Sequence, residues 1–220
     1  MTIRLIDLSH TIEAGMVTFK GIPGPLICDY WEREASAKNY DNGESFQIGQ
    51  IDMVANTGTY VDSPFHRYAD GCDLAGLALE LLADLAGIVL RRPWRDSLAT
   101  DVVDLSHLDV RGKAVLIHTG WDEHWRTEPY FSDHPFLTKA AAEWLVANGA
   151  AFVGIDSHNI DDTRTRSRPV HSALLGANIP IGEHLTNLAA LPNDGFTFHA
   201  VPPKIVGMGT FPVRAYAVLA

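Results

Sequence analysis

Residues 138–156 (TKAAAEWLVANGAAFVGID) predict an α-helix over 138–148 that leads directly into a buried strand. Thr138 is a good N-cap residue, and Gly149 supplies the stop signal just after the helix. The apolar run at 151–155 then predicts a strand. A helix-to-strand step of this kind is typical of an α/β domain.

Alternating or continuous apolar patterns outside this step predict further elements. We expect strands at 2–8, 46–55, 86–91, 113–118 and 213–219, a short leucine-rich helix at 73–84, and an apolar segment at 179–181 followed by a polar turn at 182–183. Residues 15–45 are rich in glycine, proline and charge, and they predict a long loop of the kind that is usually functional. The chain is therefore predicted to form one α/β domain over residues 1–220, with a mixed sheet and flanking helices.

The chain of 220 residues is acidic, with a formal net charge of −10 and a pI of about 5.3. An acidic protein repels phosphate backbones, so we expect no nucleic-acid partner. The one basic cluster (Arg164, Arg166 and Arg168) is typical of a solvated loop or an interface. No apolar run reaches the ~20 residues of a membrane span, and the N-terminus does not resemble a signal peptide. With two cysteines that we expect to be free thiols, the chain is predicted to be cytoplasmic.

The segment NTGTYVDSPFH, residues 56–66, carries four side chains that can bind a metal or move protons: Asn56, Tyr60, Asp62 and His66. If the segment begins in an extended form, positions 56, 60 and 62 project to one face. Spacing alone leaves a second interpretation open, in which this is an Asx-rich turn and Asp62 caps its own backbone.

Two further candidate ligands, His171 and Glu183, lie far downstream. Carboxylates and imidazoles are ligands that zinc and manganese prefer. Together with Asp62 they would form a site with two oxygen ligands, one nitrogen ligand and room for water. In a linear sequence this set is a weak indication, because a single histidine or glutamate is usually structural or solvated.

The 56–66 segment resembles the signature of the cyclase family, which includes bacterial kynurenine formamidases and isatin hydrolase-like enzymes. The signature is His-x-Gly-Thr-His-x-Asp-x-Pro-x-His, and the chain matches it at Gly58, Thr59, Asp62, Pro64 and His66. Further likenesses follow in the same order: HTGW at 118–121, AFVGIDSHNID at 151–161, VHSALL at 170–175, IPIGEHLTNLAAL at 179–191 and PPKIVGMGTFPVRAYAVL at 202–219. The resemblance implies a swivelling β/β/α fold and assembly as a homodimer or homotetramer.

The chain departs from the family at two metal-binding histidines, which fall on Asn56 and Tyr60. In two-metal relatives those histidines and a shared aspartate hold one ion. An asparagine carbonyl is a weak zinc ligand, and a phenol must lose a proton with a pKa near ~10 to ligate well. The set implied for the second ion is intact in Asp62, His171 and Glu183. The resemblance therefore implies one divalent ion, zinc or manganese, with magnesium and a metal-free site left open.

His66 matches the catalytic histidine of the family, and an imidazole with a pKa near ~6.5 can take and return a proton at neutral pH. Tyr60 is a second catalytic candidate, as a phenolic acid or as a hydrogen-bond donor to a substrate carbonyl. We assign Asn56, Trp121 and His118 to substrate binding. The aromatic-rich segment around Trp121 would suit an aromatic or cyclic substrate.

These residues predict a metal-dependent hydrolase that acts on a small cyclic or aryl amide, formamide, ester or lactone. Two alternatives stay open. The first is a metal-independent cyclase, dehydratase or isomerase that uses Tyr60 and His66 as an acid–base pair. The second is a non-catalytic small-molecule binder with a decayed site. Kynurenine formamidase activity itself is disfavoured, because relatives with that activity carry the two missing histidines.

Overall fold

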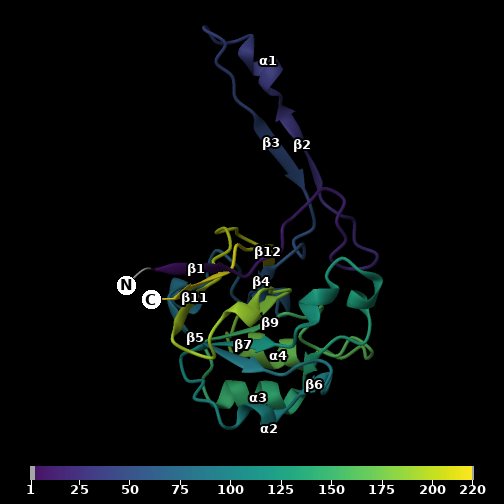
Figure 1. Ribbon diagram of the computed structural model, residues 1–220, viewed down its shortest axis with the longest axis vertical. Helices are drawn as coiled ribbons and strands as arrows, with labels where there is room; N and C mark the ends of the chain where they lie inside the picture. Colours follow the sequence, from purple (N-terminus) through teal and green to yellow (C-terminus); the bar gives the residue numbers. More distant parts are fainter. Residues whose placement is uncertain (1–2, 220) are drawn as a thin grey trace.

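The computed structural model describes residues 3–219, and its main feature is a curled, mixed sheet of nine strands (Figure 1). The strand order is β1-β13-β11-β5-β7-β9-β10-β4-β12. The bounds are β1 Arg4–Asp7, β4 Tyr60–Asp62, β5 Leu85–Arg91, β7 Ala114–His118, β9 Phe152–Ile155, β10 Ile181–Glu183, β11 Phe196–His199, β12 Thr210–Pro212 and β13 Tyr216–Leu219. The central strands β5, β7, β9 and β10 pair in parallel, and the pairs on both flanks are antiparallel. The α/β class predicted from the sequence is confirmed.

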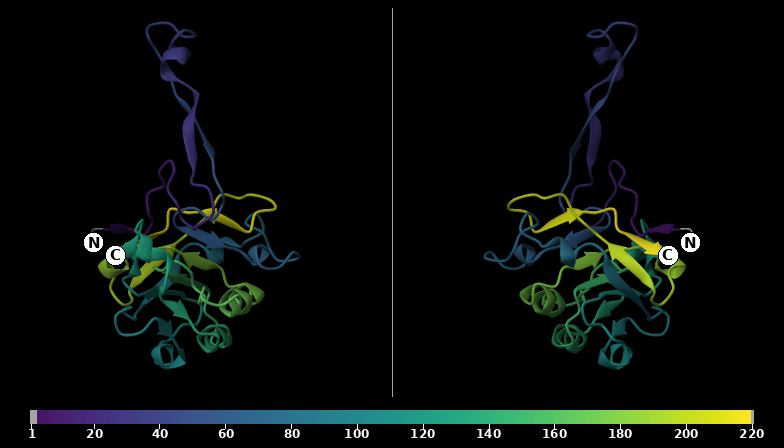
Figure 2. Two further views of the ribbon diagram at one scale, coloured as in Figure 1. Left: turned by 90° about the vertical axis from the view of Figure 1, so that its right-hand side faces the viewer. Right: turned by 90° about the vertical axis from the view of Figure 1, so that its left-hand side faces the viewer.

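Three helices, α2 (Val102–Leu105), α3 (Lys139–Ala147) and α4 (Pro169–Gly176), lie together on one face of this sheet (Figure 2). Their apolar side chains and those of the parallel strands form one hydrophobic cluster, which includes the fully buried Leu145. The other face of the curled sheet encloses a second cluster, which includes Phe152 and Phe198. No helix in residues 3–219 has the length and apolar character that crossing a membrane requires.

The predicted helix-to-strand step at 138–155 is confirmed. Thr138 is the N-cap of α3, and its hydroxyl accepts a hydrogen bond from the backbone N–H of Ala141 at 3.1 Å. Gly149 adopts a φ of +75°, a conformation that favours glycine and ends the helix. The chain then turns into β9, every residue of which is buried.

A long arm projects from the body of the molecule (Figures 1 and 2). It comprises residues 26–52 and contains β2 (Leu26–Trp31), α1 (Arg33–Ala37) and β3 (Ile48–Asp52), with β2 and β3 paired as a separate antiparallel sheet. The predicted strand at 46–55 therefore exists in shortened form, and the prediction of a loop across 15–45 is wrong where β2 and α1 form. A second small sheet joins β6 (Ala99–Thr100) to β8 (Phe136–Leu137).

The helix predicted at 73–84 is wrong, because only a 3-10 turn at Leu79–Leu81 forms there. The Asp73 side chain accepts a hydrogen bond from the N–H of Gly76 at 3.0 Å, which replaces a helical turn with a local one. Asp84, with a φ of 55°, closes the segment.

Other boundaries shift. The strand predicted at 2–8 is β1, Arg4–Asp7, and residue 2 lies outside the described residues. The strand predicted at 213–219 is limited to β13, and the polar turn predicted at 182–183 is wrong, because both residues belong to β10.

Candidate active site

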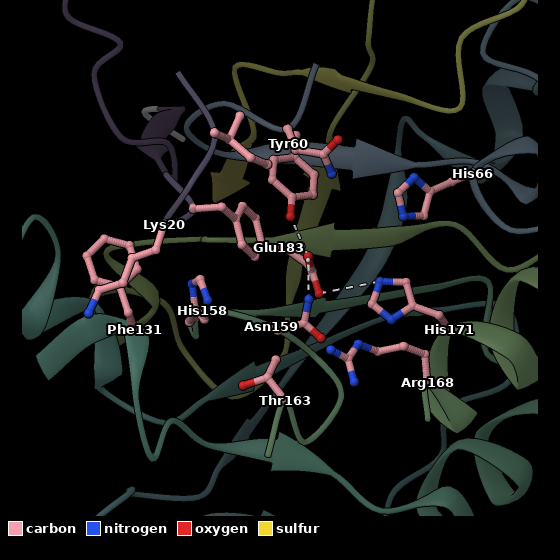
Figure 3. Close-up of a pocket in the computed structure, with 13 residues that line it drawn as sticks. Lys20, Tyr60, His66, Phe131, His158, Asn159, Thr163, Arg168, His171 and Glu183 are labelled. Carbon is pink, nitrogen blue, oxygen red and sulfur yellow. Dashed lines mark hydrogen bonds and ion pairs between the residues drawn. The ribbon is translucent and has the colours of Figure 1, made fainter. Parts of the chain in front are cut away.

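A cavity of about 520 Å³ gathers most of the candidate residues from separate parts of the chain (Figure 3). Its wall combines aromatic and apolar groups with basic and polar ones. The lining residues are Phe19, Lys20, Ile22, Asn56, Tyr60, His66, Phe131, His158, Asn159, Thr163, Arg168, His171 and Glu183.

Tyr60 and Glu183 face each other because β4 and β10 pair antiparallel with these two residues in register. The Tyr60 hydroxyl donates a hydrogen bond to Glu183 Oε2 at 2.5 Å, and the backbone N–H of Ile160 donates to Oε1 at 2.7 Å. Burial, followed by the charges of Glu183 and Asp62, raises the pKa of Tyr60 well above its ordinary value. Tyr60 is therefore a neutral phenol that orients Glu183.

His171 is oriented by Asp161, a residue that the sequence reasoning did not assign to the site. Asp161 accepts hydrogen bonds from the backbone N–H groups of Val170 and His171, and His171 Nδ1 lies 2.6 Å from Asp161 Oδ2. Because a carboxylate only accepts, Nδ1 carries the proton and Nε2 is left to act as a ligand. His171 Nε2 lies 3.6 Å from Asp62 Oδ2 and 3.6 Å from Glu183 Oε1.

His66 is held against Asp62 by Thr210, another residue not assigned from the sequence. The Thr210 hydroxyl donates to Asp62 Oδ1, and its oxygen lies 2.9 Å from His66 Nδ1. With its single proton given to Asp62, Thr210 must accept from Nδ1–H. His66 Nε2 is then left unprotonated in the neutral ring. Gly209 permits this approach, since a Cβ there would lie 2.5 Å from the backbone nitrogen of His66.

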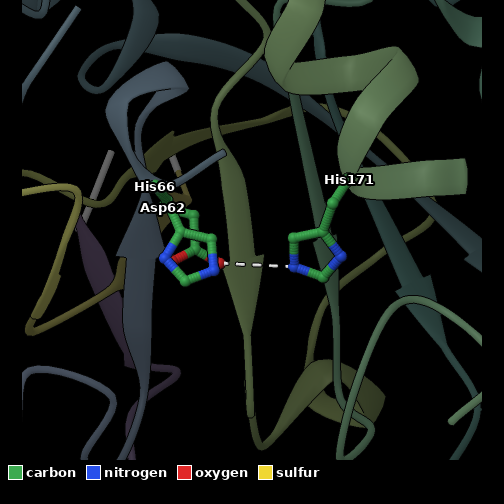
Figure 4. A group of neighbouring side chains, drawn as sticks. All are labelled: Asp62, His66 and His171. Atoms are coloured by element: carbon green, nitrogen blue, oxygen red, sulfur yellow. Dashed lines mark ion pairs between the residues drawn. The ribbon is translucent and has the colours of Figure 1, made fainter. Parts of the chain in front are cut away.

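The donor set fits a divalent cation. Asp62, His66 and His171 each offer a ligand atom, and these atoms lie within 4.8 Å of one another (Figure 4). Asp62 Oδ2 is buried and accepts no hydrogen bond from residues 3–219. A buried carboxylate oxygen without a donor is costly unless a cation compensates it.

The charges around His171 also favour a cation. Burial by itself lowers the pKa of His171, but the hydrogen bond to Asp161 and two further carboxylates raise it to about 10. Burial raises the pKa of Glu183 in the same cluster. The position between these side chains therefore has a negative potential, which a bound divalent ion would offset.

The structure brings together Asn56, Tyr60, His66, His171 and Glu183 at the cavity, with Asp62 buried beside His66 and His171, but it places two other predicted residues elsewhere. His118 Nδ1 lies 2.9 Å from Arg91 Nη1, outside the cavity. The Trp121 indole is buried against Trp94 and donates its N–H to the carbonyl of Tyr130 at 3.1 Å. The assignment of His118 and Trp121 to substrate binding has no support in their position, because each is committed to contacts within the fold.

The aromatic wall of the cavity comes instead from Phe19 and Phe131, with His158 packed between them. Phe131 belongs to the aromatic-rich stretch that follows Trp121, so the segment indicated by the sequence does line the cavity, although Trp121 itself does not. Phe19 lies in the segment 15–45 that was expected to be functional, but no sequence pattern singled out this side chain.

Comparisons with known proteins agree with this geometry. Residues 6–162 match the profile of the family described as "Putative cyclase". The chain is 29% identical to a kynurenine formamidase of Geobacillus thermodenitrificans (strain NG80-2), over 96% of this chain and 95% of the relative. It is 26% identical to a kynurenine formamidase of Erythrobacter litoralis (strain HTCC2594), over 92% of this chain and 88% of the relative.

Among solved structures, isatin hydrolase A from Ralstonia solanacearum shares the fold, with a TM-score of 0.82 and 22% identity, over 99% of this chain and 92% of that protein. The family profile ends before His171 and Glu183, whereas the relatives match the chain over nearly its whole length. The chain belongs to the cyclase family.

Proposed function

We propose that this protein is a metal-dependent hydrolase of a small cyclic or aryl amide, formamide, ester or lactone. The observation that carries the proposal is the convergence of Asp62, His171 and Glu183, with Asp62 Oδ2 buried and lacking a hydrogen-bond donor among the described residues. The kynurenine formamidases and the isatin hydrolase similar to this chain support an amide substrate.

Asp62, His171 and Glu183 would hold one divalent ion, zinc or manganese. When bound, such an ion polarises a carbonyl and lowers the pKa of a water molecule. His66 Nε2, left unprotonated by the contact of Nδ1 with Thr210, takes a proton from water and returns it to the leaving group. Tyr60 keeps Glu183 oriented, and the rings of Phe19 and Phe131 offer an apolar wall to a cyclic substrate.

A second candidate is a metal-independent cyclase, dehydratase or isomerase. The observation that favours it is that Tyr60 and His66 both line the cavity, so the two could act as an acid–base pair. The raised pKa of Tyr60 weakens the phenol as an acid, which is why we prefer the hydrolase.

We further propose that the protein is cytoplasmic and acts as a homodimer or homotetramer on a small molecule. The exposed Cys28 and the partly buried Cys72 are both unpaired, which suits a reducing compartment. The exposed arm offers a surface that a second copy of the chain could cover.

The test is the metal content of the purified protein, measured by elemental mass spectrometry without chelators. We expect about one ion per chain, lost in Asp62→Ala because the ligand shared by the cluster is removed. Asp109→Ala, at an exposed carboxylate away from the cavity, is the matched control and should retain the ion. Protein grown with ample zinc and manganese that carries no metal would overturn the proposal and favour the metal-independent enzyme.

A further inference from the structure

A small cavity of about 120 Å³ adjoins the main one and is lined by His66, Arg67, Asn159, Arg168 and His171. Four of these residues also line the main cavity, so the two spaces are adjacent. The small cavity presents two guanidinium groups, and no carboxylate lines it. We call it the two-arginine cavity.

Arg168 is held in place by the backbone of its own loop. Its Nη1 donates to the carbonyl oxygens of Thr165 at 2.8 Å and Ser167 at 2.7 Å. The guanidinium points toward Asn159 and His171 (Figure 3). Its other nitrogens make no hydrogen bond within residues 3–219, so they are available to a ligand in a fixed orientation.

Neither arginine of this cavity has a carboxylate partner in the described part of the chain. Arg67 donates from Nε to the Ser172 hydroxyl at 3.1 Å and makes no ion pair. Arg164, in contrast, pairs with Asp162 at 2.8 Å on the surface of the same loop. The protein has a net charge of −10, so two guanidinium groups without a carboxylate partner make the surroundings of this cavity unusually basic.

The charge balance leaves this cavity attractive to an anion. Asp62, Asp161 and Glu183 lie around His171, and a divalent ion would offset two of these three negative charges. With Arg67 and Arg168 included, the ion-loaded site carries a net positive charge. The guanidinium group is the side chain best matched to a carboxylate, which it can bind through two parallel hydrogen bonds.

We propose that the two-arginine cavity binds a carboxylate carried by the substrate, which makes the substrate class small aryl or cyclic amides and lactones with a carboxylate near the scissile bond. This proposal rests on the proposed function. His66 and His171 border both spaces, so a carboxylate held by Arg168 would fix the scissile carbonyl beside the metal-binding residues.

The first experiment measures binding of benzoate and of the isosteric neutral benzamide by calorimetry, with metal-loaded and with chelator-treated protein. We expect benzoate to bind at least roughly tenfold more tightly to the metal-loaded protein, since a charge-assisted pair is worth about that factor. A smaller preference should persist in the chelator-treated protein, where the two arginines remain but the carboxylates are no longer offset by the ion. Arg168→Gln and Arg67→Gln should each remove most of the preference. Arg166→Gln, at an exposed arginine of the same loop that lines neither cavity, should leave it unchanged.

Equal affinities in the wild type, or a preference that survives both arginine substitutions and vanishes with the metal, would overturn the proposal, because the carboxylate would then be held by the ion. If Arg168→Gln does not fold, as judged from its thermal unfolding, Arg67→Gln decides the result. Binding to chelator-treated protein requires neither metal nor turnover, so it separates this proposal from failure of the hydrolase.

The second experiment separates a substrate carboxylate from one formed in the product. It compares kcat/KM for 2-formamidobenzoate and formanilide, which share a scissile formamide and differ in the ring carboxylate. A value for 2-formamidobenzoate that is roughly tenfold higher, and that Arg168→Gln reduces to the level of formanilide, supports the proposal. Equal kcat/KM values for the two compounds would overturn the proposal and would indicate that the cavity binds the carboxylate of the product instead.

Discussion

At the scale of single residues, orientation of the ligands matters as much as their identity. The proton of His171 is directed to Asp161, and that of His66 is directed to Thr210. Both imidazoles therefore present Nε2 to the cavity region. This arrangement would let a site that lacks two of the family's histidines place the proposed ion ligand beside the proposed base.

The roles of His66 and Tyr60 can be separated by substitution. His66→Gln removes the proposed base, so we expect kcat to fall by about 10²–10⁴-fold. The metal should be retained, because Asp62, His171 and Glu183 remain to hold it even though His66 also lies within reach of the ion. Tyr60→Phe removes only the hydrogen bond to Glu183, and we expect a smaller loss. The measurement is turnover of an amide or lactone found by screening, beside elemental analysis. Equal and large losses in both variants, with no dependence on metal, would instead support the acid–base pair.

The pH dependence of stability should reflect buried histidines. Burial lowers the pKa of His158 to about 3, helped by the nearby charges of His134 and Lys20, and burial lowers that of His10 to about 4 despite Asp122. The unfolded chain therefore binds protons below pH 6.5 that the folded chain rejects. This contribution to stability is present above pH 6.5 and is lost as the pH falls toward the folded-state values.

At pH 5, each of these two histidines should lower the free energy of unfolding by about 2 kcal/mol relative to neutral pH. Urea unfolding between pH 7.5 and pH 5 measures this slope. In His158→Gln, the free energy of unfolding should decrease less between pH 7.5 and pH 5, by the contribution of one histidine. This comparison does not depend on how stable the variant is at pH 7.5. Parallel curves for the two proteins would contradict the prediction.

The site residues differ in how far they could be predicted. The resemblance to the cyclase family was sufficient to select Asp62, His66, His171 and Glu183, which the structure brings together, although their roles stay predictions. Asp161 lies in a quoted motif, but nothing in the sequence showed that its carboxylate reaches the ring of His171. Contacts of this kind depend on tertiary packing, which short motifs do not encode.

At the scale of secondary structure elements, a pair of glycines on β9 and β10 makes room for the ring of Phe152. Gly154 and Gly182 are in register, and a Cβ on Gly182 would lie 2.8 Å from the ring of Phe152.

Gly182→Ala should therefore destabilise the protein by about 1–3 kcal/mol, because Phe152 is fully buried and must shift. Chemical denaturation measures the change. Gly49→Ala is the control, since its Cβ would meet only the flexible side chain of exposed Gln47. A variant at Gly182 that is as stable as the control would show that the core can relax around the added methyl group.

Elements that carry their own local signals were the predictable ones. The helix α3 has its cap at Thr138 and its stop at Gly149, and both signals lie within the segment itself. The segment 73–84 has leucines and a cap-like bond at Asp73, but its backbone also bonds to a distant residue, with Leu74 N–H donating to Met208 O at 2.9 Å. Its structure therefore depends on contacts that only the folded chain provides.

At the scale of the whole molecule, the arm is the feature that the rest of the chain leaves unexplained. Every residue of β2 and β3 is exposed, and the exposed side chains include apolar ones. The large apolar ones on these strands are Leu26, Ile27, Tyr30, Trp31, Ile48 and Ile51. A two-stranded ribbon is marginally stable at best in water, so a ribbon of this composition favours a covering partner. A second copy is the occupant we propose, since closed homo-oligomers are the commonest assemblies.

Removal of the arm should therefore change the oligomeric state without unfolding the body. Leu26 and Asp52 are paired at the base of the ribbon, so their neighbours can be joined by a short glycine–serine link in place of residues 26–52. Light scattering coupled to size-exclusion chromatography should show a dimer or tetramer for the intact chain and a monomer for the shortened one. Retained metal content would show that the body remains folded, because the proposed ligands all lie outside the arm. An intact chain that is monomeric at micromolar concentration, or a shortened chain with an unchanged oligomeric state, would contradict this assignment of the arm.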